Sequence, residues 1–172
     1  MVVTHDEELA ERIRKLRHGG QGRVHHHELL GRNSRLDEIQ AAVLRFKLSS
    51  LEECNEVRRQ QAARYDAAFA DLELKTLPCA AGLVPNRHIY PVRTTRRDKL
   101  CSYLAERGVE TLVHYPTPLP EQPALRRFLN AGQKFPAAEA ASREILSLPL
   151  YPELTEEEID GIISSVRGFF KN

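Results

Sequence analysis

The clearest pattern in the chain is a long amphipathic stretch that begins near residue 34. Apolar residues recur there at three- and four-residue steps, which is the spacing of one helix face. Ser34 suits the N-cap, with Asp37 in the capping-box position, and Ser49-Ser50 is a weak point. A single helix is predicted over residues 34–71, where around 38 residues would span roughly 57 Å, enough to link two domains. Its apolar stripe consists of Leu36, Ile39, Val43, Phe46, Leu51, Cys54, Val57, Ala62, Tyr65 and Phe69.

Shorter apolar runs before and after this stretch predict strands. Met1–Thr4 has the pattern of half a buried strand, and Thr4 is expected to cap a helix that Gly19-Gly20 ends. Three further strands are predicted at Leu72–Leu77, His88–Arg93 and Val109–His114. Pro91 lies inside the second of these and predicts an edge strand or a bulge, because proline cannot donate to a ladder.

Three longer helices are predicted as well, one between the last two strands and two after them, and a short helix is predicted at Ala124–Asn130. Thr95 and Asp98 open the first, which carries Leu100 and Leu104 and ends at Gly108. The second is predicted over Ala137–Leu146 after Pro136, and the third follows a capping box of Thr155 and Glu158. Strand–helix–strand spacing of this kind predicts an α/β fold with helices packed on an open sheet.

Composition restricts the class of protein further. The 25 basic and 24 acidic residues of this 172-residue chain nearly cancel, so no strong field for nucleic acid or anionic membrane is expected. No apolar run approaches the ~18 residues of a membrane span, and the N-terminus lacks a signal-peptide pattern. Cys54, Cys79 and Cys101 show no ligand spacing and are expected to be reduced thiols. A cytoplasmic protein without nucleic-acid or membrane partners is predicted.

Two polar segments are candidates for chemistry. His25-His26-His27 lies in a predicted polar loop over residues 21–32, but adjacent side chains of an extended loop diverge, so no metal site is expected. Asn33 and Arg35 lie at the predicted helix start, where unpaired N–H groups and the helix dipole favour a phosphate. The alternative is that Asn33 only caps the helix.

The second segment also resembles a known family signature. Gly31-x-Asn33-x-Arg35-Leu36-Asp37-Glu38-x-Gln40 is similar to that of the DegT/DnrJ/StrS family. These are pyridoxal-phosphate (PLP) aminotransferases that act on nucleotide-linked keto sugars. Further stretches resemble other family motifs in the same order, namely Met1–Ala10, Arg17-His18-Gly19, His114–Leu119 and Ser147–Ile159.

The resemblance implies the C-terminal portion of a fold-type-I PLP-dependent transferase: the end of the large domain, a long linking helix and a small α/β domain. Residues 1–33 would be the remnant of the large PLP-binding domain, comprising its last strand, a helix and an active-site loop. Residues 34–172 would form the long helix and the small domain. The chain is therefore expected to begin within a domain, after the family's PLP-binding lysine.

The resemblance also implies site residues. A family asparagine that matches Asn33 contacts the PLP phosphate from the neighbouring subunit, so Asn33 is the expected cofactor-binding residue and a homodimer is the expected assembly. Arg35, His114 and Tyr115 are expected to contact the nucleotide-sugar substrate. Relatives usually carry a histidine where this chain has Pro120-Glu121, a departure that would alter substrate contacts or reflect a relaxed constraint.

The expected function is that of a C-terminal segment of an aminotransferase that moves an amino group from an amino acid to a nucleotide-linked keto sugar. None of the six lysines lies in the family's lysine motif, so the segment alone is expected to be inactive and to hold no catalytic residue. Two alternatives stay open: a non-catalytic remnant or interaction protein, and the family's sugar dehydratases, in which histidine replaces the lysine. The lysines are Lys15, Lys47, Lys75, Lys99, Lys134 and Lys171.

Overall fold

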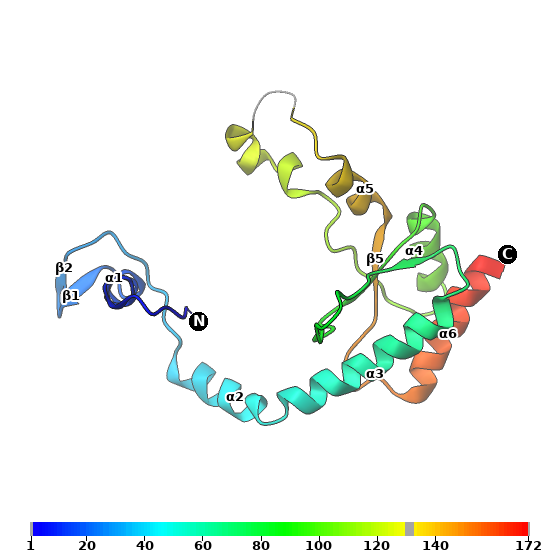
Figure 1. Cartoon of the computed structure of the whole chain (residues 1–172), viewed down its shortest axis with the longest axis horizontal. Helices are drawn as coiled ribbons and strands as arrows, with labels where there is room; N and C mark the ends of the chain where they lie inside the picture. Colours follow the sequence, from blue (N-terminus) through cyan, green and yellow to red (C-terminus); the bar gives the residue numbers. More distant parts are fainter. Residues whose placement is uncertain (1, 130–132, 172) are drawn as a thin grey trace. The chain divides into compact units, whose positions relative to one another are not determined.

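The computed structural model describes residues 2–129 and 133–171. The chain forms two compact units, residues 1–50 and residues 51–172 (Figure 1). The boundary between them follows Ser50, whereas the sequence-based division follows Asn33. The helical residues up to Ser50 therefore group with the N-terminal part of the chain.

Unit 1 contains two helices and a short antiparallel hairpin. In chain order these are α1 (Glu7–Arg17), β1 (Gln21–Arg23), β2 (His26–His27) and α2 (Glu38–Leu48). The predicted Thr4 cap of α1 is wrong, because Asp6 accepts the hydrogen bond from the Leu9 amide at 2.9 Å. The helix ends before Gly19 and Gly20, as predicted, and both glycines have positive φ. The predicted strand at the N-terminus is also wrong, since residues 2–4 pair with no described segment; Met1 lies outside the described residues.

The single helix predicted over residues 34–71 is two helices, α2 and α3 (Leu51–Phe69). The break falls at the weak point, where the hydroxyls of Ser49 and Ser50 donate to the carbonyls of Phe46 and Lys47 at 2.7 and 3.3 Å. These bonds satisfy carbonyls at the end of α2 and end the helix there.

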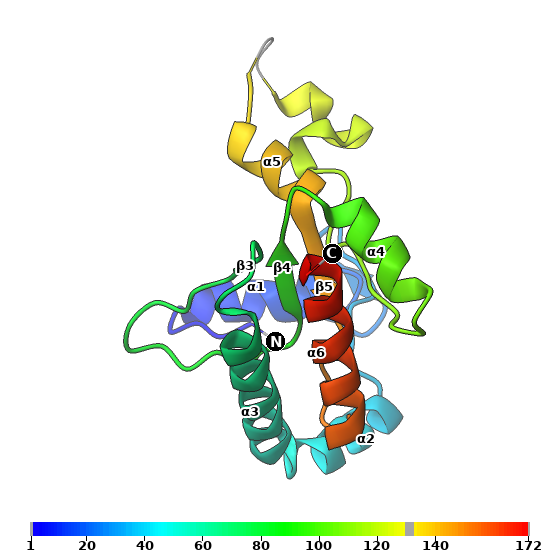
Figure 2. The ribbon, with the colours of Figure 1, turned by 90° about the vertical axis from the view of Figure 1, so that its right-hand side faces the viewer.

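Unit 2 contains a three-stranded antiparallel sheet in the order β3-β4-β5. The strands are β3 (Lys75–Thr76), β4 (Tyr90–Arg93) and β5 (Ile145–Leu148). Besides α3, the helices are α4 (Arg97–Ala105), α5 (Pro136–Glu144) and α6 (Glu156–Lys171), with two 3-10 helices, η1 (Leu119–Glu121) and η2 (Pro123–Phe128). α6 contacts both α3 and α4, and α4 contacts β5, so the core lies between these helices and the sheet (Figure 2).

Strand pairing differs from the prediction at two places. The segment Val109–His114 is not a strand, and only Leu112 pairs, through an isolated bridge to Ser147. The third strand is instead β5, whose first residues were predicted as the end of a helix. α5 begins at Pro136 as predicted but ends at Glu144, because the next residues pair with β4.

β4 is the central strand, so the edge position expected from Pro91 is wrong. Pro91 opposes Ser147, whose backbone amide and carbonyl both bond to Leu112 on the far side, at 2.7 and 3.2 Å. Pro91 is thus at a position that exchanges no hydrogen bond with β5. Its missing N–H faces the other neighbour, where the β3 pairing has already ended at Thr76 opposite Val92. A proline is therefore tolerated inside this sheet.

The core of unit 2 is built around the apolar face of α6. The predicted capping box is confirmed: the Thr155 amide donates to Glu158 Oε2 at 2.8 Å, and the Glu158 amide donates to Thr155 Oγ1 at 3.2 Å. The helix buries Ile159, Ile162, Val166 and Phe169. Their partners in the core are Ala62, Tyr65, Phe69, Leu74, Tyr90, Val92, Leu100, Leu104, Leu146, Leu148, Leu150 and Leu154.

Unit 1 has no comparable core. All the buried apolar side chains of the described chain belong to unit 2. The large apolar residues of α2, such as Ile39 and Phe46, are 82% and 81% exposed. Unit 1 is therefore held mainly by backbone hydrogen bonds, and the large apolar side chains of α2 stay exposed in it. Among the described residues, no helix is long and apolar enough to cross a membrane.

The packing of unit 2 gives a direct stability prediction. Leu104→Ala, at a fully buried position of α4, should lower the free energy of unfolding by about 2–5 kcal/mol, because it leaves a cavity in the core. Leu83→Ala, at an exposed loop position, should change the free energy by less than about 0.5 kcal/mol. Urea unfolding followed by circular dichroism measures both. Equal effects of the two substitutions would contradict this core.

The two buried tyrosines give a pH prediction. Burial raises the pKa of the Tyr65 and Tyr90 hydroxyls above the ordinary value. The unfolded chain loses these protons from about pH 10, whereas the folded chain keeps them, so the free energy of unfolding should fall as pH rises above about 10. Tyr65→Phe should make that fall shallower, and should cost about 0.5–1.5 kcal/mol at neutral pH through the lost bond to Pro149 O.

The control for this prediction is Tyr115→Phe, because Tyr115 is exposed. Urea unfolding between about pH 8 and 11 measures the three slopes. We expect the Tyr115→Phe slope to match that of the parent. An unchanged slope in Tyr65→Phe would show that Tyr65 is not the group that couples pH to stability.

Candidate functional site

Backbone hydrogen bonds hold Asn33 in an extended segment beside the end of α1. The amides of both its neighbours donate to carbonyls of that helix, Arg32 to Leu16 and Ser34 to Arg17, each at 2.8 Å. The Asn33 side chain is exposed and makes no hydrogen bond within the described part of the chain. Its amide group is therefore available at a fixed place.

Two glycines permit this close approach of backbone to backbone. A Cβ at Gly31 would lie 2.2 Å from the Gly20 nitrogen, and a Cβ at Gly20 would lie 1.7 Å from the Leu29 carbonyl oxygen. Neither position can accept a side chain without moving the backbone, and Gly20 also has φ of 82°. The glycine of the Gly31-x-Asn33 motif is thus part of the support for Asn33.

The prediction that Asn33 and Arg35 lie at a helix start is wrong. α2 begins at Glu38 with Asp37 as its N-cap, and the Asp37 amide donates to Gln40 Oε1 at 3.4 Å. The predicted Ser34 cap is wrong, because Ser34 lies three residues before the N-cap; its amide donates instead to the Arg17 carbonyl. The carboxylates of Asp37 and Glu38 at the start of α2 already complement the helix dipole. The dipole of α2 is therefore not part of an anion site at Asn33.

Arg35 remains a candidate by its own charge. It is exposed, and its guanidinium forms no ion pair with a described residue. An amide and a guanidinium two residues apart are donors of the kind that bind phosphate oxygens.

The histidine run lies in the β1–β2 hairpin rather than in an irregular loop. His26 and His27 form β2, and His25 has φ of 62° just before it. His27 Nδ1 lies 2.8 Å from the Gly19 carbonyl oxygen, which joins the hairpin to the end of α1. Within residues 2–129 and 133–171, no group of three or more His, Cys, Asp or Glu side chains could hold a metal ion.

Unit 2 provides the other predicted site residues, His114 and Tyr115. They lie at one end of a groove of about 780 Å³, between the proline-rich loop and α5. The two rings meet edge to face with centroids 5.5 Å apart. The remaining walls are mostly apolar and consist of Pro116, Thr117, Pro118, Leu119, Pro120, Gln122, Ala138, Ala141, Ser142 and Ile145.

Ser147 is a site residue that the sequence analysis missed. It is buried in β5, and its Oγ lies 2.9 Å from His114 Nδ1. The signal for it was a hydroxyl in an otherwise apolar run, since a buried polar side chain needs a partner. That partner could not be identified without the strand pairing.

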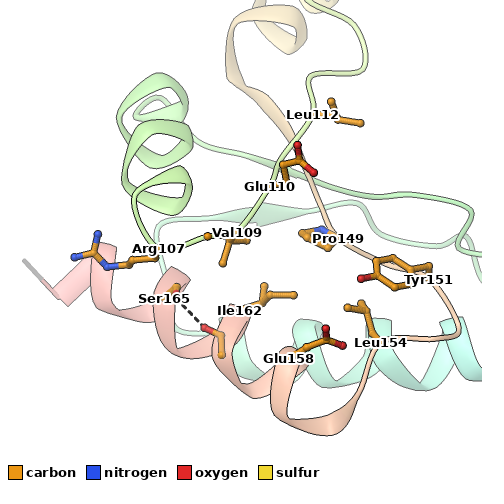
Figure 3. Close-up of a pocket in the computed structure, with 12 residues that line it drawn as sticks. Arg107, Val109, Glu110, Leu112, Pro149, Tyr151, Leu154, Glu158, Ile162 and Ser165 are labelled. Atoms are coloured by element: carbon orange, nitrogen blue, oxygen red, sulfur yellow. Dashed lines mark hydrogen bonds between the residues drawn. The ribbon is translucent and has the colours of Figure 1, made fainter.

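A second cavity, of about 730 Å³, lies between residues 107–112 and α6 (Figure 3). Two of its polar groups serve the local structure: Glu158 caps α6, and Ser165 Oγ donates to the Gly161 carbonyl at 2.8 Å. In the groove at His114, the Tyr115 hydroxyl and His114 Nε2 have no hydrogen-bond partner among the described residues. That groove also contains both residues that the sequence analysis named in unit 2, so it is the better candidate for binding a ligand.

Lys15 is held in an ion pair and is not activated as a nucleophile. Lys15 Nζ lies 2.7 Å from Glu28 Oε2, and this hydrogen bond raises the pKa of Lys15. A nucleophilic lysine needs the opposite shift. Lys15 therefore serves unit 1 as an ion-pair partner.

Most of the chain matches known proteins. Residues 1–167 match the DegT/DnrJ/EryC1/StrS aminotransferase family. The chain is 44% identical over 167 residues to dTDP-3-amino-3,4,6-trideoxy-alpha-D-glucose transaminase of Streptomyces venezuelae, an alignment that covers 96% of this chain and 44% of the relative. The chain thus spans less than half the length of that relative.

Solved structures agree with this match. DesV of S. venezuelae in complex with a ketimine intermediate has a TM-score of 0.92 at 42% identity, covering 99% of this chain and 46% of DesV. The PLP form of Spr1654 of Streptococcus pneumoniae, named as a sugar aminotransferase, has a TM-score of 0.84 at 26% identity. The match covers 98% of this chain and 45% of Spr1654. The fold is therefore an α/β part of a fold-type-I aminotransferase. On both sequence and structure, the chain belongs to the DegT/DnrJ/EryC1/StrS aminotransferase family.

Proposed function

We propose that these residues are the C-terminal segment of a PLP-dependent aminotransferase, which moves an amino group from an amino acid to a nucleotide-linked keto sugar. The observation that carries this proposal is the support of Asn33. The family motif supplies a glycine at a position where an added Cβ would lie 2.2 Å from the Gly20 nitrogen, and an amide that makes no hydrogen bond within the described chain. The S. venezuelae relative, a transaminase of a dTDP-linked amino sugar, supports the substrate class.

The residues of unit 1 fit the phosphate of PLP by their chemistry. Asn33 offers an amide N–H and Arg35 a guanidinium, and neither is engaged by another described residue. Charge-assisted hydrogen bonds to a dianion are among the stronger polar contacts in proteins. When bound, PLP supplies the electron sink that aminotransfer requires. Asn33 would hold its phosphate, and Arg35 would bind the anionic part of the nucleotide-sugar substrate; the aminotransfer chemistry is left to other groups.

The groove of unit 2 suits a sugar nucleotide. Its proline-rich wall is stiff and apolar, and an exposed aromatic ring, that of Tyr115, stands at its end. Such a ring can stack on a base or a sugar face. The Tyr115 hydroxyl and His114 supply the polar contacts that would orient the ligand.

We also infer that the 172 residues are inactive by themselves. Aminotransfer needs a lysine amine to hold the cofactor and to move the substrate proton. The lysines of this sequence lie outside the family's lysine motif, and the ion pair with Glu28 raises the pKa of Lys15.

A homodimer is part of the proposal. Large apolar side chains of α2 are exposed in this chain, and exposed apolar surface of this kind marks an interface. Ile39, Val43 and Phe46 share one face of the helix, and Leu44 and Leu48 lie on another. A partner subunit that covers α2 would also lie next to the segment that presents Asn33.

Asn33→Ala in the full-length protein should weaken PLP retention roughly ten- to hundredfold, since a hydrogen bond to a charged acceptor is worth about 1.5–3 kcal/mol. Cofactor absorbance during dialysis measures the retention. Asn86→Ala is the matched control, because Asn86 is an exposed asparagine whose side chain accepts only the His88 amide. Equal retention in Asn33→Ala and parent would remove Asn33 from the cofactor site.

Mixing subunits tests whether Asn33 serves its neighbour. If it does, a heterodimer of an Asn33→Ala subunit and a lysine-dead subunit contains one intact site, formed by the lysine of the first and the asparagine of the second. Activity should then recover on mixing. If Asn33 serves its own subunit, no mixed dimer has an intact site and activity stays absent.

The 172-residue chain alone should form no stoichiometric lysine adduct with PLP. Incubation with PLP, borohydride reduction and peptide mapping should show only scattered, substoichiometric labelling of exposed lysines. A single lysine labelled to completion, together with turnover, would contradict the inferred inactivity. Lys15→Arg is a useful control, because it preserves the ion pair with Glu28 and removes the amine.

A further inference from the structure

His114 and Ser147 form a pair whose geometry determines how the histidine can act. His114 Nδ1 and Ser147 Oγ are 2.9 Å apart, which is within hydrogen-bond distance. Either atom could be the donor from distance alone. If Ser147 donates, His114 carries its proton on Nε2; if His114 donates, Nε2 is a bare acceptor and could serve as a base.

The surroundings of Ser147 distinguish these arrangements. Ser147 is only 5% exposed, and its backbone amide and carbonyl are both bonded to Leu112. Among the described residues, the only hydrogen-bond partner of its hydroxyl is His114 Nδ1. A buried hydroxyl that donates no hydrogen bond destabilises the folded state by about 1–3 kcal/mol.

The opposite arrangement would require a different acceptor for the Ser147 proton. No described residue other than His114 is a hydrogen-bond partner of this hydroxyl, so the acceptor would have to be a group such as a water in the adjoining small cavity of about 170 Å³. Ordering such a water costs entropy, and it would give Ser147 only the one hydrogen bond that it can already make by donating to His114 Nδ1. The balance therefore favours Ser147 as the donor.

We propose that Ser147 is a positioning residue that holds His114 in the Nε2–H tautomer. The ring edge that remains free then presents a neutral N–H donor. It binds an oxygen acceptor of the ligand, such as a phosphate oxygen, a sugar hydroxyl or a carbonyl, and cannot accept a proton as a general base. This role of His114 rests on the proposed function, whereas its tautomer depends only on this chain.

The backbone makes the arrangement rigid. The Leu112–Ser147 bridge joins β5 to the segment that leads into His114, so the hydroxyl and the ring are fixed by the same pair of main-chain bonds. Positioning of a donor by an outer hydrogen bond is a common way in which proteins fix a histidine tautomer.

Nitrogen NMR of the 172-residue chain with ¹⁵N-labelled histidine tests the proposal without cofactor or substrate. At a pH at which the ring is neutral, long-range proton–nitrogen correlations show which ring nitrogen carries the proton, and His114→Ala assigns the signal among the seven histidines. We expect His114 to be a single Nε2–H tautomer with an unprotonated, hydrogen-bonded Nδ1. A His114 protonated on Nδ1 would overturn the proposal.

Variants test whether Ser147 is the cause. Ser147→Ala should shift the Nδ1 signal toward that of a ring exchanging between both tautomers, and Ser147→Thr, which keeps a hydroxyl, should restore the parent signal. Ser165→Ala removes a hydroxyl that bonds within α6 and should leave His114 unchanged. An unchanged Nδ1 signal in folded Ser147→Ala would overturn the positioning role. The parent measurement stands even if a variant does not fold.

Discussion

The pairing of β5 is the constraint on which unit 2 depends. This strand bonds to β4 on one side and, through Ser147, to Leu112 on the other, so it joins three segments that are far apart in the sequence. It also carries Leu146 and Leu148 into the core, and the chain beyond it leads to the capped start of α6. Without β5, the proline-rich loop and His114 would have no fixed relation to the helices beneath them.

Elements that depend on local chemistry were predictable. α6 follows from its capping box and apolar period, and α1 ends at its glycine pair, because the residues that decide these features are neighbours. Elements that depend on distant partners were not. Ser34 had the sequence pattern of a cap, but its amide donates to the Arg17 carbonyl in an extended segment and the helix begins only at Glu38. β5 had the pattern of a helix end, but its residues pair with β4.

The candidate site shows the same division. Asn33, Arg35, His114 and Tyr115 could be named from motifs, since motifs record which residue types occur together. What the motifs could not supply is how these residues are held. The role of Gly31 depends on its distance from Gly20, and the partner of His114 depends on which strand passes next to it.

Pro91 has a consequence for how the sheet assembles. β4 and β5 place Tyr90 and Val92 opposite Leu148 and Leu146, and these are the pairs that exchange hydrogen bonds, because the intervening Ser147 bonds elsewhere. A slip of one residue would put Pro91 in a bonding position, leave a β5 carbonyl without a donor, and turn the core side chains of β4 outward. Because Pro91 lacks an N–H, it destabilises the sheet whose register is shifted by one residue and costs no hydrogen bond to β5 in the native register. Pro91 therefore selects the native register of β4 and β5.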